Sequence, residues 1–259
     1  IIFIGATVIG SMARKFDMRC TSDIVILMFF DDSRVGGHAA ARFASQYRGF
    51  YVDVLAKAVR HNVPISIYTI FTSRLQSQTS RHNAHFLRHA INALSGFEGK
   101  GQSGCIVGDA SVIQKICREA PPQTQDDVIR YISTKQEKLC DGYFSIGGLS
   151  QEATAKWFGN SFNAPFHAAR NVLDLRNIAY EDTKEGVIKS FESFSKTVAM
   201  LLRELAKKVS EYSGACDRFR DDTKNIALRP QLDPNLVYTD SSDVLVLLLA
   251  SCSQKSDET

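Results

Sequence analysis

Apolar residues in the first 72 positions gather into three short runs that are typical of β-strands. These runs are residues 1–5 (IIFIG), 24–30 (IVILMFF) and 63–71 (VPISIYTIF). Between the second and third runs, residues 38–61 repeat apolar positions at steps of three and four, which predicts an amphipathic helix. A strand, a helix and a strand joined by short links are typical of a βαβ unit. The pattern therefore predicts an α/β or α+β amino-terminal part with a small sheet.

Helical spacing becomes more frequent after this region. Residues 81–95 (RHNAHFLRHAINALS) have the pattern of a helix that ends at Gly96. Residues 105–120 predict a short strand, an Asp-Ala-Ser start signal and then a second helix. We expect both segments to belong to the amino-terminal part.

The best linker candidate is residues 120–127 (APPQTQDD), because Pro121 and Pro122 cannot continue a helix. We therefore expect an α/β domain at 1–119 and a mainly helical domain at 120–259. The chain has 259 residues, of which 44% are hydrophobic, so it has enough apolar surface for a sizeable core.

The clearest single element of the second part is a predicted helix over residues 184–213. Its apolar positions alternate steps of four and three, and Asp182 or Thr183 can cap its start. We expect this helix to be the spine of the helical domain. The final apolar run, Val244 to Ala250, has the length of a strand and is the expected exception to the helical pattern. The apolar stripe of the predicted helix consists of Val187, Phe191, Phe194, Val198, Leu201, Leu205, Val209 and Tyr212.

Net charge and cysteine content limit the partners and the cellular location that we expect for the protein. The formal net charge of +3 permits an anionic partner but does not demand one. The six cysteines include no C-x-x-C pair, and a chain of this length does not need disulfides, so we expect reduced thiols and an intracellular, cytoplasmic location. No apolar run reaches the roughly 18–20 residues of a membrane span, and no signal peptide is visible. We expect no contact with a membrane.

Two short polar motifs flank the first two apolar runs. Gly10-Ser11, followed by Arg14, closes the first run, and Ser22-Asp23 opens the second. A glycine lets the backbone approach a phosphate closely, and a serine hydroxyl can bond a phosphate oxygen. The pattern makes the segment a candidate phosphate-binding turn.

This segment resembles the signature of the polymerase-β-like nucleotidyltransferase superfamily. In that family an apolar strand ends in Gly-Ser, and about ten residues later Ser-Asp-x-Asp places two carboxylates on one strand face, where both can hold divalent metals. A third carboxylate from a later strand completes a two-metal site. The resemblance implies a nucleoside triphosphate with Mg²⁺ as the ligand. It also implies that Gly10 and Ser11 bind phosphate, that Arg14 is a basic contact and that Asp23 is the first metal carboxylate.

The chain differs from the family pattern at positions that bind metal ions in the family. The second carboxylate position is Val25, and the glycine expected after Ala-Arg is Lys15. The run 63–71 offers no third carboxylate, Asp53 lies in a predicted helix, and Asp31 and Asp32 lie past the strand end. The resemblance therefore implies a nucleotide- or RNA-binding protein with a degenerate site, with no catalytic residue and no resident metal.

The same residues allow a second interpretation, a Rossmann-type dinucleotide-binding protein or oxidoreductase. Residues 1–16 fit a strand, a G-x-x-x-x-G turn and a helix, and Asp31 closes the next strand. Thr7 stands where the middle glycine of the fingerprint belongs. The two interpretations differ over residues 11–20, a loop in the first and a helix in the second. An ordinary α/β edge with no ligand remains a third possibility.

A structural or assembly protein is the alternative from a different class. Here the long helix 184–213 mediates contacts in a homo-oligomer, a scaffold or an RNA-coating assembly. The aromatic residues of the helical part are expected to pack as a core cluster, although exposed rings near Arg170 could stack on bases. These aromatic residues are Trp157, Phe158, Phe162 and Phe166.

One local cluster of basic side chains stands out in the predicted helix 81–95. Its three histidines share one helical face but spread over about 10 Å, too far for one metal ion without bending. A basic surface that faces solvent or RNA phosphates is therefore favoured, and histidine protonation would strengthen phosphate binding below about pH 6.5. The cluster consists of Arg81, His82, His85, Arg88 and His89.

Overall fold

The computed structural model confirms a small mixed sheet followed by a mainly helical part. Among the described residues, those up to Pro122 form one compact unit and those from Gln123 onward form another, and each is described by itself. The structure describes residues 1–9, 24–34, 37–60, 65–75, 87, 90, 91, 94, 105–148, 151–221 and 233–253.

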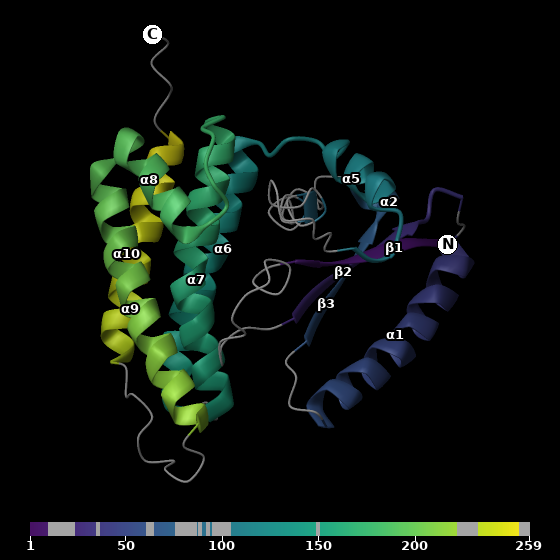
Figure 1. The fold of residues 1–259 in the computed structure, drawn as a ribbon, viewed down its shortest axis with the longest axis horizontal. Helices are drawn as coiled ribbons and strands as arrows, with labels where there is room; N and C mark the ends of the chain where they lie inside the picture. Colours follow the sequence, from purple (N-terminus) through teal and green to yellow (C-terminus); the bar gives the residue numbers. More distant parts are fainter. Residues whose placement is uncertain are drawn as a thin grey trace. The chain divides into compact units, whose positions relative to one another are not determined.

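The first unit contains a four-stranded sheet in the order β3-β2-β1-β4. Strand β1 pairs antiparallel with both β2 and β4, whereas β2 and β3 are parallel. The parallel pair requires a crossover connection, and α1 provides it. The predicted βαβ unit is therefore confirmed (Figure 1). The bounds are β1 Ile2–Ile9, β2 Ile24–Asp31, α1 Gly37–Arg60, β3 Ile65–Phe71 and β4 Cys105–Gly108.

Helix α1 covers one face of this sheet (Figure 1). Aromatic side chains of α1 contact those of β2 and β3. The ring of Phe30 on β2 lies 4.9 Å from Phe43 and 6.1 Å from Tyr47, measured between centroids. Phe71 on β3 lies 5.9 Å from Phe43. Edge-to-face aromatic pairs of this kind add to the energy of apolar burial.

The opposite face is covered by α5 (Ala110–Arg118), which Asp109 caps by accepting a hydrogen bond from the Ser111 amide. Ile113 and Cys117 of α5 belong to the apolar cluster that also contains Leu27 of β2. Helical residues 87, 90, 91 and 94 are also part of this cluster. A short helix, α2 (Thr72–Leu75), follows β3 directly.

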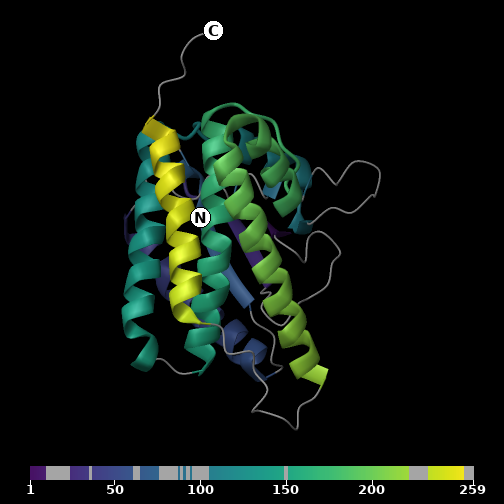
Figure 2. The same ribbon diagram turned by 90° about the vertical axis from the view of Figure 1, so that its left-hand side faces the viewer.

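The second unit is a bundle of helices around an apolar core. Helix α6 begins with a capping box in which Thr124 and Asp127 bond each other's backbone amides. Helix α10 packs beside both α6 and α7 (Figure 2). Trp157, Phe158, Phe162 and Phe166 are buried, so the predicted aromatic core cluster is confirmed. The helices are α6 Gln125–Ser145, α7 Gln151–Leu175, α8 Lys184–Phe194, α9 Lys196–Asp221 and α10 Pro234–Ser253, with a 3₁₀ turn at Ile146–Gly148.

The prediction of one continuous helix over 184–213 is wrong. Ser195 has an extended backbone, with φ −150° and ψ 99°, and separates α8 from α9. Glu192 and Arg203 form an ion pair across the break. Eleven residues of straight helix would separate these two residues by about 16 Å, so α9 folds back on α8. Serine is a preferred N-cap residue, and this preference was the overlooked signal.

The strand expected at Val244 to Ala250 is also wrong, because this run lies within α10. The helix starts at Pro234, and Asp233 accepts a hydrogen bond from the Asn235 amide at 2.9 Å. Val244, Leu245 and Leu248 are buried against α6 and α7, so bundle packing outweighs the strand preference of the run. Neither α10 nor any other helix in the described part of the chain is long and apolar enough to cross a membrane.

Candidate functional site

The candidate phosphate-binding motif adjoins, in the sequence, the end of one strand and the start of the next. Strand β1 ends at Ile9 and β2 begins at Ile24, and Ile9 pairs with Val25 in antiparallel register. The end of β1 and the start of β2 therefore lie side by side. The motif residues Gly10, Ser11, Arg14 and Asp23 themselves lie outside the described residues.

Val25 occupies an apolar environment at this end of the sheet. It is half-buried and packs against the cluster that contains Ile9, Leu27 and Phe29. Its neighbour in β3 is Ser66, so the adjacent parallel strand supplies no carboxylate at this level. Val25 stands where the family has its second metal carboxylate. Among the described strands, it packs against the core, and its neighbour Ser66 in β3 carries a hydroxyl group.

The Rossmann interpretation is wrong because β1 and β2 run antiparallel. In a dinucleotide-binding βαβ unit the two strands are parallel, so the acidic residue at the end of the second strand lies at the same sheet edge as the glycine turn. Here Asp31 pairs with Ile2, and seven residues of strand at about 3.3 Å each place it roughly 23 Å from the level of Ile9. Residues 11–20, which the two interpretations assign differently, lie outside the described residues.

Asp31 and Asp32 connect the far end of the sheet to α2. Asp31 accepts a hydrogen bond from the Ser33 amide at 2.9 Å and from the Thr72 hydroxyl at 3.3 Å. Asp32 accepts from the Ser73 amide at 2.9 Å and from the Ser73 hydroxyl. Hydrogen bonds from Ser33 lower the pKa of Asp31. Burial raises the pKa of Asp32, but the hydrogen bonds it accepts, chiefly from Ser73 and also from Thr72, together lower it below its ordinary value. Both carboxylates therefore serve local structure.

The remaining candidate groups give no metal centre in the described part of the chain. There, no group of three or more histidine, cysteine, aspartate or glutamate side chains could hold a metal ion. Asp53 lies on α1, in agreement with the helix predicted there, and its side chain is exposed. The basic cluster Arg81, His82, His85, Arg88 and His89 lies outside the described residues.

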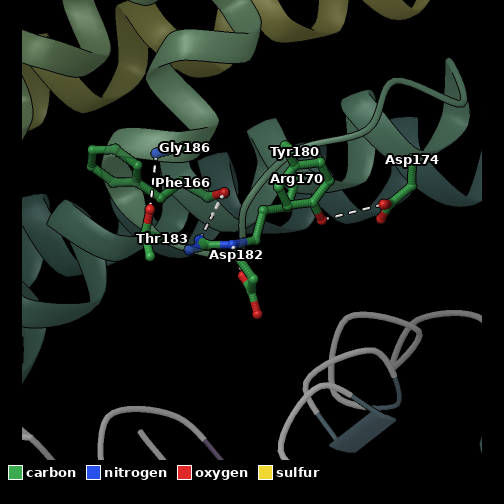
Figure 3. A network of polar contacts seen from close by, with 7 residues as sticks. All are labelled: Phe166, Arg170, Asp174, Tyr180, Asp182, Thr183 and Gly186. Carbon is green, nitrogen blue, oxygen red and sulfur yellow. Dashed lines mark hydrogen bonds and ion pairs between the residues drawn. The ribbon is translucent and has the colours of Figure 1, made fainter. Parts of the chain in front are cut away.

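The helical unit contains a buried polar network that sequence reasoning did not single out (Figure 3). The Arg170 Nε donates to Asp182 Oδ1 at 2.7 Å, and both side chains are less than one tenth exposed. The Arg170 Nη1 also donates to the Phe166 carbonyl at 3.3 Å. A charge in this environment is stable only when paired, so the partners depend on each other. An arginine amid the apolar positions of α7 was the available signal.

Further contacts of this network hold the connection between α7 and α8 (Figure 3). The Tyr180 hydroxyl donates to Asp174 at 3.2 Å, and Thr183 caps α8 by accepting from the Gly186 amide at 2.9 Å. The Lys184 ammonium lies 4.9 Å from the centroid of the Phe166 ring. The network fastens this connection to α7, and we assign it a structural role.

Comparisons with known proteins do not assign this chain to a family. No protein-family model and no curated protein matches the chain. Among solved structures, the chain is similar to a nucleotidyltransferase-like protein from Exiguobacterium sibiricum, with 13% identity and a TM-score of 0.31. The similarity covers 96% of this chain and 69% of that chain. A TM-score of this size is too low for residues of the two chains to be equated.

Proposed function

We propose that this protein binds a nucleoside triphosphate through the turn between β1 and β2 and does not catalyse nucleotidyl transfer. The pairing of Ile9 with Val25 carries this proposal, because it brings together the strand ends next to Gly10-Ser11 and Ser22-Asp23. A glycine and a serine beside one carboxylate suit a phosphate chain and its associated Mg²⁺.

The absence of transfer follows from the carboxylate set. Two-metal transfer needs several carboxylates that bridge the metals. Val25 packs in an apolar cluster, and its neighbour Ser66 is a hydroxyl residue. Asp31 and Asp32 lie at the other end of β2 and are already hydrogen-bonded there. Asp23 would then be the sole acid of the motif.

The basic cluster of the predicted helix 81–95 is the proposed contact for RNA phosphates. In this helix Leu87, Ala90 and Leu94 are buried in the apolar cluster of the first unit. At 100° per residue, the three histidine positions of the predicted helix fall on the side opposite these buried residues. We therefore expect them to face solvent, where protonation strengthens binding to phosphate.

A thermal-shift experiment tests triphosphate binding. At a ligand concentration of 100 times Kd, binding stabilises the folded state by about 2.7 kcal/mol, which raises Tm by several degrees. The double variant Gly10→Val with Ser11→Ala should lose this shift. Ser145→Ala with Gly147→Val is the matched control, because both positions are exposed and Gly147 has open space around it. If no nucleoside triphosphate raises Tm with or without Mg²⁺, the proposal is wrong.

Two further measurements separate the parts of the proposal. Incubation with labelled triphosphate and RNA should yield no transferred nucleotide, and robust product formation would contradict the non-catalytic assignment. Fluorescence anisotropy with single-stranded RNA should show tighter binding at pH 6 than at pH 8. Replacement of His82, His85 and His89 by glutamine should remove this pH dependence, and an unchanged profile would exclude the cluster as an RNA contact.

A further inference from the structure

Helices α6 and α10 share an exposed aromatic cluster at the end of α6 and the start of α10. The ring of Tyr143 stacks on that of Tyr238, with 4.6 Å between centroids, and lies 5.4 Å from the ring of Phe144. The Tyr143 hydroxyl also donates a hydrogen bond to Asn235 Oδ1. Phe144 is 78% exposed, more than any other large apolar side chain in the described part of the chain. Exposed apolar side chains that gather in one place are typical of an interaction surface.

The exposed surface continues from this cluster along both helices. On α10, Asn235, Thr239 and Val246 follow one another at helical spacing and are exposed, Val246 by 50%. The eleven residues from Asn235 to Val246 span about 16 Å, or three helical turns. Within this length Gln136 of α6 donates a hydrogen bond to Ser242 of α10 at 3.5 Å, so α6 lies beside α10 there (Figure 2). A helix of about three turns therefore matches this surface in length.

Carboxylates flank the aromatic cluster on both helices. Glu137 and Asp141 precede Phe144 at steps of four and three, so the three side chains share one side of α6, and all are exposed. Asp243 of α10 is exposed as well. Among the residues that the structure describes, none of these three carboxylates has an ion-pair partner. At 100° per residue, Lys138 falls about 120° from Phe144 around α6, so the surface keeps its negative charge.

We propose that this aromatic–acidic face binds a basic amphipathic helix of another protein. The apolar side of that helix covers Phe144 and Val246, and its lysine or arginine side chains pair with the three carboxylates. An amphipathic helix laid on an apolar surface is a recurrent mode of peptide recognition. Charge complementarity favours this partner over RNA, because carboxylates repel phosphates. The inference is independent of the nucleotide site. The face consists of Glu137, Asp141, Tyr143, Phe144, Tyr238, Asp243 and Val246.

Fluorescence anisotropy with two labelled peptides tests this inference. One peptide consists of leucine and lysine, with its leucines on one helical side, and the other has glutamate in place of lysine. The protein should bind the lysine peptide but not the glutamate peptide, and added salt should weaken binding. Phe144→Ser should weaken binding about tenfold or more, because an apolar anchor is lost. Glu137→Gln with Asp141→Asn should weaken it about threefold or more.

Control variants on α9 separate this face from the rest of the surface. Met200→Ser removes an apolar side chain that is 53% exposed, and Glu204→Gln with Glu211→Gln removes two exposed carboxylates. Neither control should change binding of the lysine peptide. Equal unfolding temperatures of all variants exclude a folding defect.

Three outcomes would overturn the inference. The first is that the lysine peptide does not bind or that both peptides bind equally well. The second is that Phe144→Ser affects binding no more than Met200→Ser does. The third is a dimer of the protein, detected by light scattering, that Phe144→Ser dissociates while the lysine peptide does not bind. In that case the face joins two copies of this chain.

Discussion

Substitution of Gly142 by alanine should destabilise the helical unit, although glycine-to-alanine changes usually stabilise helices. A Cβ atom at this position of α6 would lie 2.0 Å from Cδ1 and 2.2 Å from Nε1 of Trp157. The indole cannot remain in place, and its Nε1 donates a hydrogen bond to the Leu139 carbonyl at 3.2 Å. Trp157 is only 7% exposed, so it has little room to move.

The magnitude follows from three contributions to the free energy of unfolding. Overpacking a core position costs about 1–3 kcal/mol. Loss of the indole hydrogen bond costs about 1 kcal/mol. The better helix propensity of alanine returns about 1 kcal/mol. We expect a net loss of about 2 kcal/mol, which lowers Tm by about 4–8 °C in a chain of this size.

Trp157 is the one tryptophan of the chain, so its fluorescence reports directly on this site. Urea denaturation followed by this fluorescence should show an earlier midpoint for Gly142→Ala. Gly159→Ala is the matched control, because Gly159 lies in α7 and an added Cβ meets nothing within 4 Å. The control should be neutral or more stable by up to about 1 kcal/mol. If both variants are equally stable, the contact between Gly142 and Trp157 does not constrain the bundle.

Three other substitutions test the described contacts. Arg170→Met should cost about 3–5 kcal/mol in urea denaturation, because it leaves Asp182 buried without its cation, and a loss below about 1 kcal/mol would contradict the buried pair. Burial raises the pKa of the Cys117 thiol to about 12, above its ordinary value of 9.0. Above about pH 9 the unfolded chain loses the thiol proton that the native state keeps, so the free energy of unfolding should fall between about pH 9 and 12. The variant Cys117→Ala should reduce this fall. Thr183→Ala should cost about 1 kcal/mol in thermal unfolding because the Gly186 amide loses its cap, whereas Thr183→Ser should be nearly neutral; equal losses would exclude the cap as the cause.

Local patterns in the sequence predicted several elements correctly. The apolar spacing of 38–61 and the strand-like runs on either side predicted the β2–α1–β3 unit. The Asp-Ala-Ser signal predicted the start of α5, where Asp109 does cap the helix. These predictions succeeded because periodicity and capping depend on residues within one or two turns of one another.

Other predictions failed because the contacts that decide them join residues far apart in the chain. The apolar run at Val244 fits a strand or a helix, and its position between α6 and α7 decides for the helix. The stripe from Val187 onward keeps its phase across Ser195, so periodicity alone does not show the break. The partner of Arg170 lies beyond the end of α7, where α-helical periodicity carries no information.

The candidate site shows the same division between local and long-range information. The sequence contains Gly10, Ser11, Asp23 and Val25, and these residues predict a phosphate-binding turn without a second carboxylate. The direction of β2 relative to β1 does not follow from the sequence, because both directions bury the same apolar side chains. The antiparallel pairing of Ile9 with Val25 brings the end of β1 and the start of β2 together and separates both from Asp31. Strand direction is set by contacts across the whole sheet, and for that reason only the tertiary structure excludes the Rossmann interpretation.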